Sequence, residues 1–176
     1  NGVKIKDVAI RKKGFLGSLD TRRPSLKIKF DEYVDQDPIK GLDRLTLNNN
    51  KQDPGRMCQY LSSRMFNKSG TAAPRCSFAK VTVNGDYLGI YSNVEAVRNP
   101  FLKSRFGSSK GNIFEGTVTD FLPRWVPRFE AKTGKSDPAV VAQIAEVMDA
   151  EEVDLEQLEK LVDIPAFMKF WAMESL

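Results

Sequence analysis

A glycine-containing turn between two predicted strands is the part of this sequence best suited to bind a phosphate group. The turn contains Gly14, Leu16, Gly17 and Ser18, and apolar and polar residues alternate on both sides of it. A loop of this kind can bring backbone N–H groups close to an anion. It has neither a Walker A spacing nor the third glycine of longer glycine-rich loops, so an ordinary hairpin turn is the alternative interpretation.

Two lysines follow this turn and could supply the fixed cation that a bound phosphate needs. The strand predicted over residues 25–30 places three apolar side chains on one face and Lys27 and Lys29 on the other. A lysine on a strand just after a glycine-rich loop can hold nucleotide phosphates. Lys27 is the first choice for this role and Lys29 the second. The alternative is that both are solvated lysines on a half-buried strand.

The elements that would position these residues are a small antiparallel sheet and one covering helix. Strands are expected over residues 3–11, 25–30 and 43–47, and over the two arms of a hairpin within 78–97. Asn84 and Gly85 supply the hairpin turn, because both tolerate the positive φ angles of a primed turn. A helix is expected from about Pro54 to Lys68, with Asp53 as its N-cap and Gly70 after its end.

The apolar residues of this helix and the pattern of the remaining chain complete the predicted organisation. An apolar stripe at three- and four-residue spacing is expected to pack on the sheet, formed by Met57, Tyr60, Leu61 and Met65. Residues 1–97 then form one lobe of class α+β. Residues 98–136 form a connecting segment with a short helix and a short strand. Residues 137–176 are helical and are expected to begin a second, truncated lobe.

Composition excludes several classes of function. The 176 residues contain no histidine, which excludes histidine general bases and histidine-containing zinc sites. No apolar run is long enough to span a membrane, and the first residues lack a signal-peptide pattern, so we expect a fragment of a longer protein. The net charge is +4, with the basic residues concentrated in 1–30. Phosphate is the expected anion. We expect no nucleic-acid partner, because a nucleic-acid motif and an aromatic platform are both missing.

Four segments in this order resemble the CotH (spore coat protein H) family of atypical, secreted protein kinases. They are residues 10–31, the helix with G-T-A-A-P-R at 70–75, the hairpin at 78–97, and the run at 97–116. The resemblance extends from about Val3 to Leu176. It implies a kinase-like N-lobe, ATP and Mg²⁺ as cofactors, and transfer of the γ-phosphate to Ser or Thr of secreted or envelope proteins. It also implies a location that is secreted, in the cell envelope or on the spore surface.

The resemblance assigns roles to individual residues. Gly14, Leu16, Gly17 and Ser18 correspond to the phosphate-contacting turn, and Gln59 stands where similar sequences have the acidic residue that holds the lysine. Glu95 follows the hairpin, near the ribose or paired with a lysine; a solvent-facing glutamate is the alternative. The metal-binding and catalytic aspartates of the family lie beyond the helix that matches 165–176. We therefore expect the Mg²⁺ ligands outside this chain and no activity from this fragment alone.

Two further expectations follow from single residues. Gln59 brings no negative charge, which favours an alternative function: a pseudokinase-like surface or adhesion module without ATP turnover. Cys58 and Cys76 are the two cysteines, and a disulfide between them is possible if the protein is secreted, as the resemblance implies.

Overall fold

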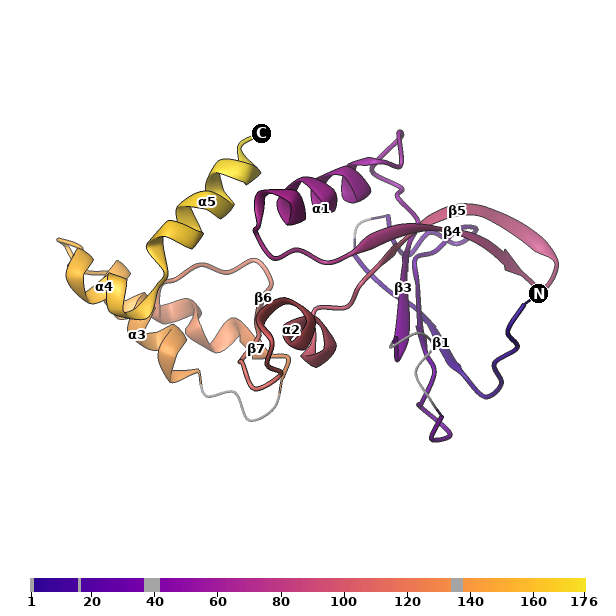
Figure 1. Ribbon diagram of the computed structural model, residues 1–176, viewed down its shortest axis with the longest axis horizontal. Coiled ribbons are helices and arrows are strands. Elements are labelled where there is room, and N and C mark those ends of the chain that lie inside the picture. Colours follow the sequence, from indigo (N-terminus) through magenta and orange to yellow (C-terminus); the bar gives the residue numbers. More distant parts are fainter. Residues whose placement is uncertain (1, 16, 37–41, 134–137) are drawn as a thin grey trace. The chain divides into compact units, whose positions relative to one another are not determined.

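The computed structural model describes residues 2–15, 17–36, 42–133 and 138–176, and Figure 1 shows their helices and strands. The chain divides into two compact units, Asn1–Ala96 and Val97–Leu176. The first unit holds a five-stranded sheet and one helix, and the second holds a two-stranded sheet and the remaining helices. The predicted α+β class is confirmed.

The sheet of the first unit is antiparallel throughout, with the strand order β1-β2-β3-β5-β4. Its strands are β1 (Ala9–Lys12), β2 (Leu26–Lys29), β3 (Arg44–Asn48), β4 (Cys76–Val83) and β5 (Asp86–Val94). The predicted hairpin is confirmed, since Asn84 and Gly85 join β4 to β5 with φ angles of 51° and 94°. The first strand is shorter than the expected 3–11. Asp7 has a φ of 54°, which is incompatible with an extended strand at that point.

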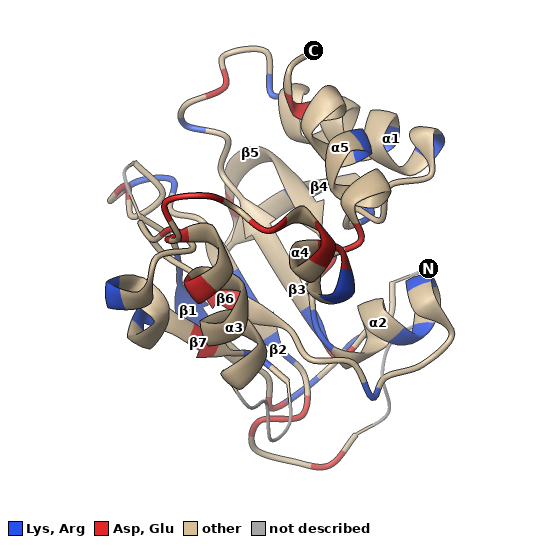
Figure 2. Ribbon diagram, turned by 90° about the vertical axis from the view of Figure 1, so that its left-hand side faces the viewer, with Lys and Arg blue, Asp and Glu red and all other residues tan. Residues whose placement is uncertain are grey.

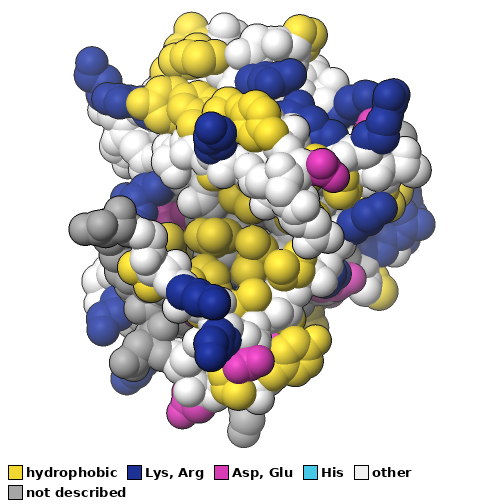
Figure 3. All heavy atoms as spheres, turned by 90° about the vertical axis from the view of Figure 1, so that its right-hand side faces the viewer, with side chains coloured by type: hydrophobic (Ala, Val, Ile, Leu, Met, Phe, Trp, Pro, Cys, Tyr) yellow, Lys and Arg dark blue, Asp and Glu magenta, His cyan; other side chains and the backbone are white. Residues whose placement is uncertain are grey.

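One face of this sheet carries the apolar core. Leu26 and Leu47 lie directly opposite each other on β2 and β3, and they cluster with Val81 and the fully buried Tyr91. Side chains alternate between the two faces of a strand, so the polar residues between these positions point to the other side. Figure 3 shows apolar side chains gathered on one face of the molecule among Lys and Arg side chains.

Helix α1 (Cys58–Ser69) covers the face of the sheet opposite to this core. Asn48, Ser92 and Phe78 are aligned across β3, β5 and β4, one residue out of phase with Leu47 and Tyr91. The ring of Tyr60 in α1 lies 5.0 Å from that of Phe78. The helix therefore packs on the polar face.

This arrangement changes two expectations about α1. The prediction that the apolar stripe packs on the sheet is correct for Tyr60, whose ring meets that of Phe78. Met57, Leu61 and Met65 are instead 44–47% exposed, because the apolar face of the sheet lies on the other side. The helix begins four residues later than expected. Its N-cap is Met57 and not the predicted Asp53, although the carboxylate of Asp53 accepts a hydrogen bond from the backbone N of Cys58 at 2.8 Å. The predicted end is confirmed, since Gly70 has a left-handed φ of 84°.

The second unit begins with α2 (Asn99–Phe106) and a two-stranded sheet. The sheet pairs β6 (Phe114–Gly116) with β7 (Phe129–Ala131), and a 3₁₀ helix, η1 (Pro123–Arg128), lies between them in sequence. Three helices follow: α3 (Ala139–Met148), α4 (Leu155–Leu161) and α5 (Ile164–Glu174). Asp154 and Asp163 cap α4 and α5. Figure 2 shows acidic residues in red along α4 and the loop before it.

Candidate functional site

The glycine turn is a tight loop that depends on glycine at its first position. Gly14 and Gly17 both have left-handed φ angles, 105° and 77°. A Cβ atom added at Gly14 would lie 2.3 Å from the Cβ of Ser18, so no other residue fits without displacing the turn. The backbone N of Ser18 donates to the carbonyl of Phe15 at 2.8 Å. Leu16, which the sequence also assigned to the site, lies outside the described residues.

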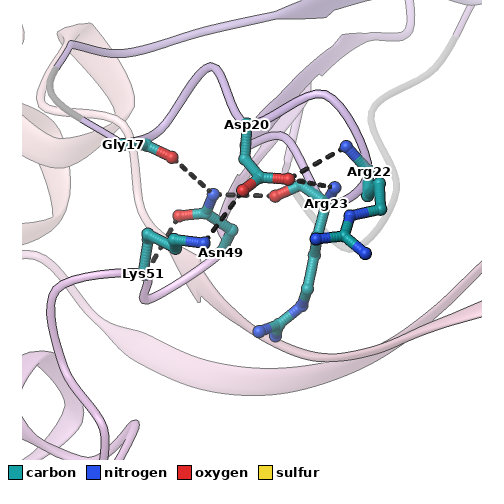
Figure 4. A network of polar contacts seen from close by, with 6 residues as sticks. All are labelled: Gly17, Asp20, Arg22, Arg23, Asn49 and Lys51. Carbon is teal, nitrogen blue, oxygen red and sulfur yellow. Dashed lines mark hydrogen bonds and ion pairs between the residues drawn. The ribbon is translucent and has the colours of Figure 1, made fainter.

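A buried asparagine anchors the turn to the end of β3 (Figure 4). Asn49 is 3% exposed, and its amide nitrogen donates to the carbonyl oxygens of Gly17 at 3.1 Å and Arg23 at 2.7 Å. Its side-chain oxygen accepts from the backbone N of Lys51 at 3.2 Å. One side chain thus connects three points of the backbone and fixes the turn to the end of β3.

Asp20 closes the same network. Its carboxylate accepts hydrogen bonds from the backbone N of Arg22 and Arg23 and forms an ion pair with Lys51 at 3.0 Å. These partners, first the Arg23 backbone N–H, lower the pKa of Asp20 to about 2. Across the loop, the Arg23 guanidinium donates to the carbonyl of Ile90 and lies 4.8 Å from the centre of the Tyr91 ring.

A cavity of about 290 Å³ opens between this turn, the end of β3 and the start of α1. It is lined by Lys13, Ser18, residues 48–53, Cys58 and Gln59. The structure therefore brings together two of the residues predicted from sequence, Ser18 of the turn and Gln59 of the helix.

A chain of polar contacts crosses this cavity wall from strand to helix. The ammonium of Lys13 donates to the side-chain oxygen of Asn48 at 2.7 Å, and the amide nitrogen of Asn48 donates to the side-chain oxygen of Gln59 at 2.7 Å. Burial, and then the like charge of Arg11, lower the pKa of Lys13.

Sequence reasoning missed Lys13 and the functions of the asparagine run. Lys13 directly precedes Gly14, and this position next to the predicted phosphate-binding turn could have identified it as a candidate cation. Each residue of the run N-N-N at 48–50 reaches a different element. Asn50 donates to the buried hydroxyl of Ser92 at 2.9 Å.

The two lysines predicted from sequence occupy different environments on β2. Lys27 lies opposite Arg11 and Thr46, on the face that α1 covers, and it is not among the residues that line the cavity. Lys29 lies at the end of β2 away from the glycine turn. Its ammonium is 2.7 Å from the carboxylate of Glu32, which is the main reason that its pKa is raised.

Glu95 lies at a different cavity from the glycine turn. Its carboxylate pairs with the guanidinium of Arg75 at 2.7 Å, and its side chain is 6% exposed. The arginine of the A-A-P-R segment is thus one partner of this glutamate. The two residues line a separate cavity of about 200 Å³ together with Arg44 and Cys76.

The disulfide that the sequence allowed does not form in this structure, where Cys58 and Cys76 are both free thiols. Their sulfurs have different surroundings. A hydrogen bond with the carboxylate of Asp53 raises the pKa of Cys58, whereas burial raises the pKa of Cys76.

Within the described ranges, no group of three or more His, Cys, Asp or Glu side chains is arranged to hold a metal ion. No helix in the same ranges is long and apolar enough to cross a membrane.

Comparison with known proteins places these features in a family. The family model described as CotH kinase protein matches residues 10–176. The inner spore coat protein H of Bacillus subtilis (strain 168) is 34% identical over 67 residues, a match that covers 38% of this chain and 18% of that protein. The chain thus matches less than a fifth of the length of this relative. The resemblance inferred from the sequence motifs is confirmed, and the chain belongs to the CotH kinase protein family.

Proposed function

We propose that this chain is the nucleotide-binding part of an atypical secreted protein kinase. In this proposal residues 1–97 form a kinase-like N-lobe, 98–136 a connecting segment, and 137–176 the helical start of a second lobe. The complete protein transfers the γ-phosphate of ATP to Ser or Thr of secreted or cell-surface proteins. Its location is secreted, in the cell envelope or on the spore surface, and similarity to an inner spore coat protein of Bacillus subtilis supports this location.

The observation that carries the proposal is the cavity beside the glycine turn. Ser18 of the turn and Gln59 of the helix both line it, and the described lining includes one carboxylate, that of Asp53. Such a surface suits the oxygen atoms of phosphate groups. In this proposal the turn approaches the phosphates, and a lysine on the sheet face covered by α1 supplies the cation, for which the sequence offers Lys27 first and Lys29 second.

The described residues that line the cavity suit phosphate groups better than they suit Mg²⁺. Asp53 already accepts a hydrogen bond from the backbone N of Cys58, and no second carboxylate lines the described cavity. Mg²⁺ prefers an octahedral shell of oxygen ligands that includes carboxylates. In this proposal the Mg²⁺ ligands and the catalytic base are expected outside this chain.

Calorimetry of ATP binding tests this function. It is measured with and without Mg²⁺, on this chain and on a version extended through the segment that follows Leu176, with adenosine as the control ligand. We expect the extended protein to bind ATP in a metal-dependent way and to bind adenosine much more weakly. A folded extended protein that binds no ATP would contradict the proposal.

A second candidate function is a surface or adhesion module that keeps the fold without ATP turnover. The neutral contact between Gln59 and Asn48 favours it, because protein kinases use a glutamate at the corresponding place on the helix. Transfer of labelled phosphate from ATP to Ser or Thr of added envelope proteins would exclude this module. ATP binding without any transfer or hydrolysis would support it.

A further inference from the structure

We propose that Lys13 is the cation that contacts the nucleotide phosphates in this chain, and that Asn48 and Gln59 are positioning residues that hold its ammonium at the cavity. This inference rests on the proposed nucleotide-binding function and identifies the residue that carries the positive charge.

Position is the first argument. Lys13 extends the β1–β2 pairing by one step, since its backbone N donates to the carbonyl of Ser25 at 3.0 Å. It lies two residues after Arg11, which is opposite Lys27, so Lys13 shares that face of the sheet and lies closer to the glycine turn. Its side chain lines the cavity together with Ser18.

The positive charge of Lys13 has no negative partner in the part of the chain that the structure describes. Among the described residues, no carboxylate pairs with the ammonium of Lys13. The hydrogen-bond partner of this ammonium within the described ranges is the neutral amide of Asn48. A half-buried ammonium that faces an amide and has a like charge, Arg11, nearby is stabilised when an anion arrives.

A glutamine at the helix position orients the side chain of Asn48. Gln59 accepts from the amide nitrogen of Asn48, and this contact requires the amide oxygen of Asn48 to face Lys13. The link orients the lysine as a lysine–glutamate pair does in protein kinases. Because Asn48 and Gln59 are both neutral, the full charge of Lys13 remains available to a phosphate.

Substitution of the lysine tests the assignment, with Lys13→Gln compared with Lys12→Gln in the extended protein. Both changes remove one positive charge, but Lys12 lies opposite Leu26 on the other face of the sheet and does not line the cavity. Loss of a charge-assisted hydrogen bond should weaken binding of ATP and of inorganic tripolyphosphate about 10- to 100-fold in Lys13→Gln. Binding of adenosine should stay unchanged in both variants, and ATP binding should change less than about threefold in Lys12→Gln.

A second measurement begins with the wild-type protein, so its first result does not depend on a variant remaining folded. NMR titration of the Lys13 side chain in the wild-type protein should show its pKa rising when tripolyphosphate is added, because the anion stabilises the ammonium. In Asn48→Ala the pKa of Lys13 without ligand should fall further, because the ammonium loses its hydrogen-bond acceptor. A purely structural contribution of Asn48 would leave this pKa unchanged.

Failure of the Lys13 assignment can be distinguished from failure of the proposed function. If the wild type binds ATP and Lys13→Gln binds it equally well, the assignment of Lys13 is wrong and the proposed function stands. Loss of binding in Lys27→Ala alone would then identify Lys27 as the cation. If the folded wild type binds neither ATP nor tripolyphosphate, the proposed function fails and the assignment fails with it.

Discussion

Replacement of the buried Asn49 by alanine should release the glycine turn from the sheet. The side chain of Asn49 donates to the carbonyl oxygens of Gly17 and Arg23 and accepts from the backbone N of Lys51. Alanine can make none of these contacts. The backbone N of Asn49 would keep its hydrogen bond to the hydroxyl of Ser25 at 3.0 Å, so the end of β3 should stay in place while the turn loosens.

The size of the effect follows from the three hydrogen bonds that are lost. Each contributes about 0.5–1.5 kcal/mol net, which gives about 1.5–4.5 kcal/mol in total. Gly17 and Lys51 are exposed, and their backbone groups can bond to water in the variant, whereas the surroundings of Asn49 are buried. We therefore expect the free energy of unfolding of the first unit to fall by about 2–3 kcal/mol.

Hydrogen exchange of individual amides is the suitable assay. Both tryptophans, Trp125 and Trp171, belong to the second unit, so tryptophan fluorescence would not report on the first. The amides of Ser18 and Ser25, which are bonded within the turn region, should exchange faster in Asn49→Ala. Gln52→Ala, at an exposed site in the same segment, should change stability by less than about 0.5 kcal/mol. Unchanged exchange in Asn49→Ala would show that this asparagine does not anchor the turn.

Three further predictions concern the same unit. Gly14→Ala should lower the melting temperature and destabilise the protein by at least about 1–2 kcal/mol, because the added Cβ meets Ser18 at a left-handed φ; a melting curve identical to wild type would contradict this. The pKa of Asp20 is lowered in the folded state, so its contribution to stability is present above pH 4 and is lost as the pH falls toward about 2. In Asp20→Asn the free energy of unfolding, measured with urea, should depend less on pH over that range; a loss as steep as in the wild type would refute the assignment. A reducing agent should leave the melting temperature unchanged, because Cys58 and Cys76 are free thiols; a lower melting temperature would reveal a disulfide.

Features that depend on local backbone preferences were predictable from the sequence. Asn84 and Gly85 made the hairpin identifiable, because few other residue pairs accept two positive φ angles, and Gly70 marked the end of α1 for the same reason. The alternation in 25–30 correctly separated the apolar side of β2 from its lysines. The ordered motifs identified the family. All of these signals arise within a few residues along the chain, or from motif order alone.

The tertiary structure alone decided how the polar side chains meet. Periodicity showed that α1 has an apolar stripe, but the strand order and register determined that it would cover the polar face of the sheet, where Gln59 meets Asn48. The same register brings Lys13 to the cavity wall and turns Asn49 inward below the glycine turn. These contacts join residues that are 11 to 35 positions apart. Local pattern cannot specify them, because a side chain's partner across strands depends on how the whole sheet is paired.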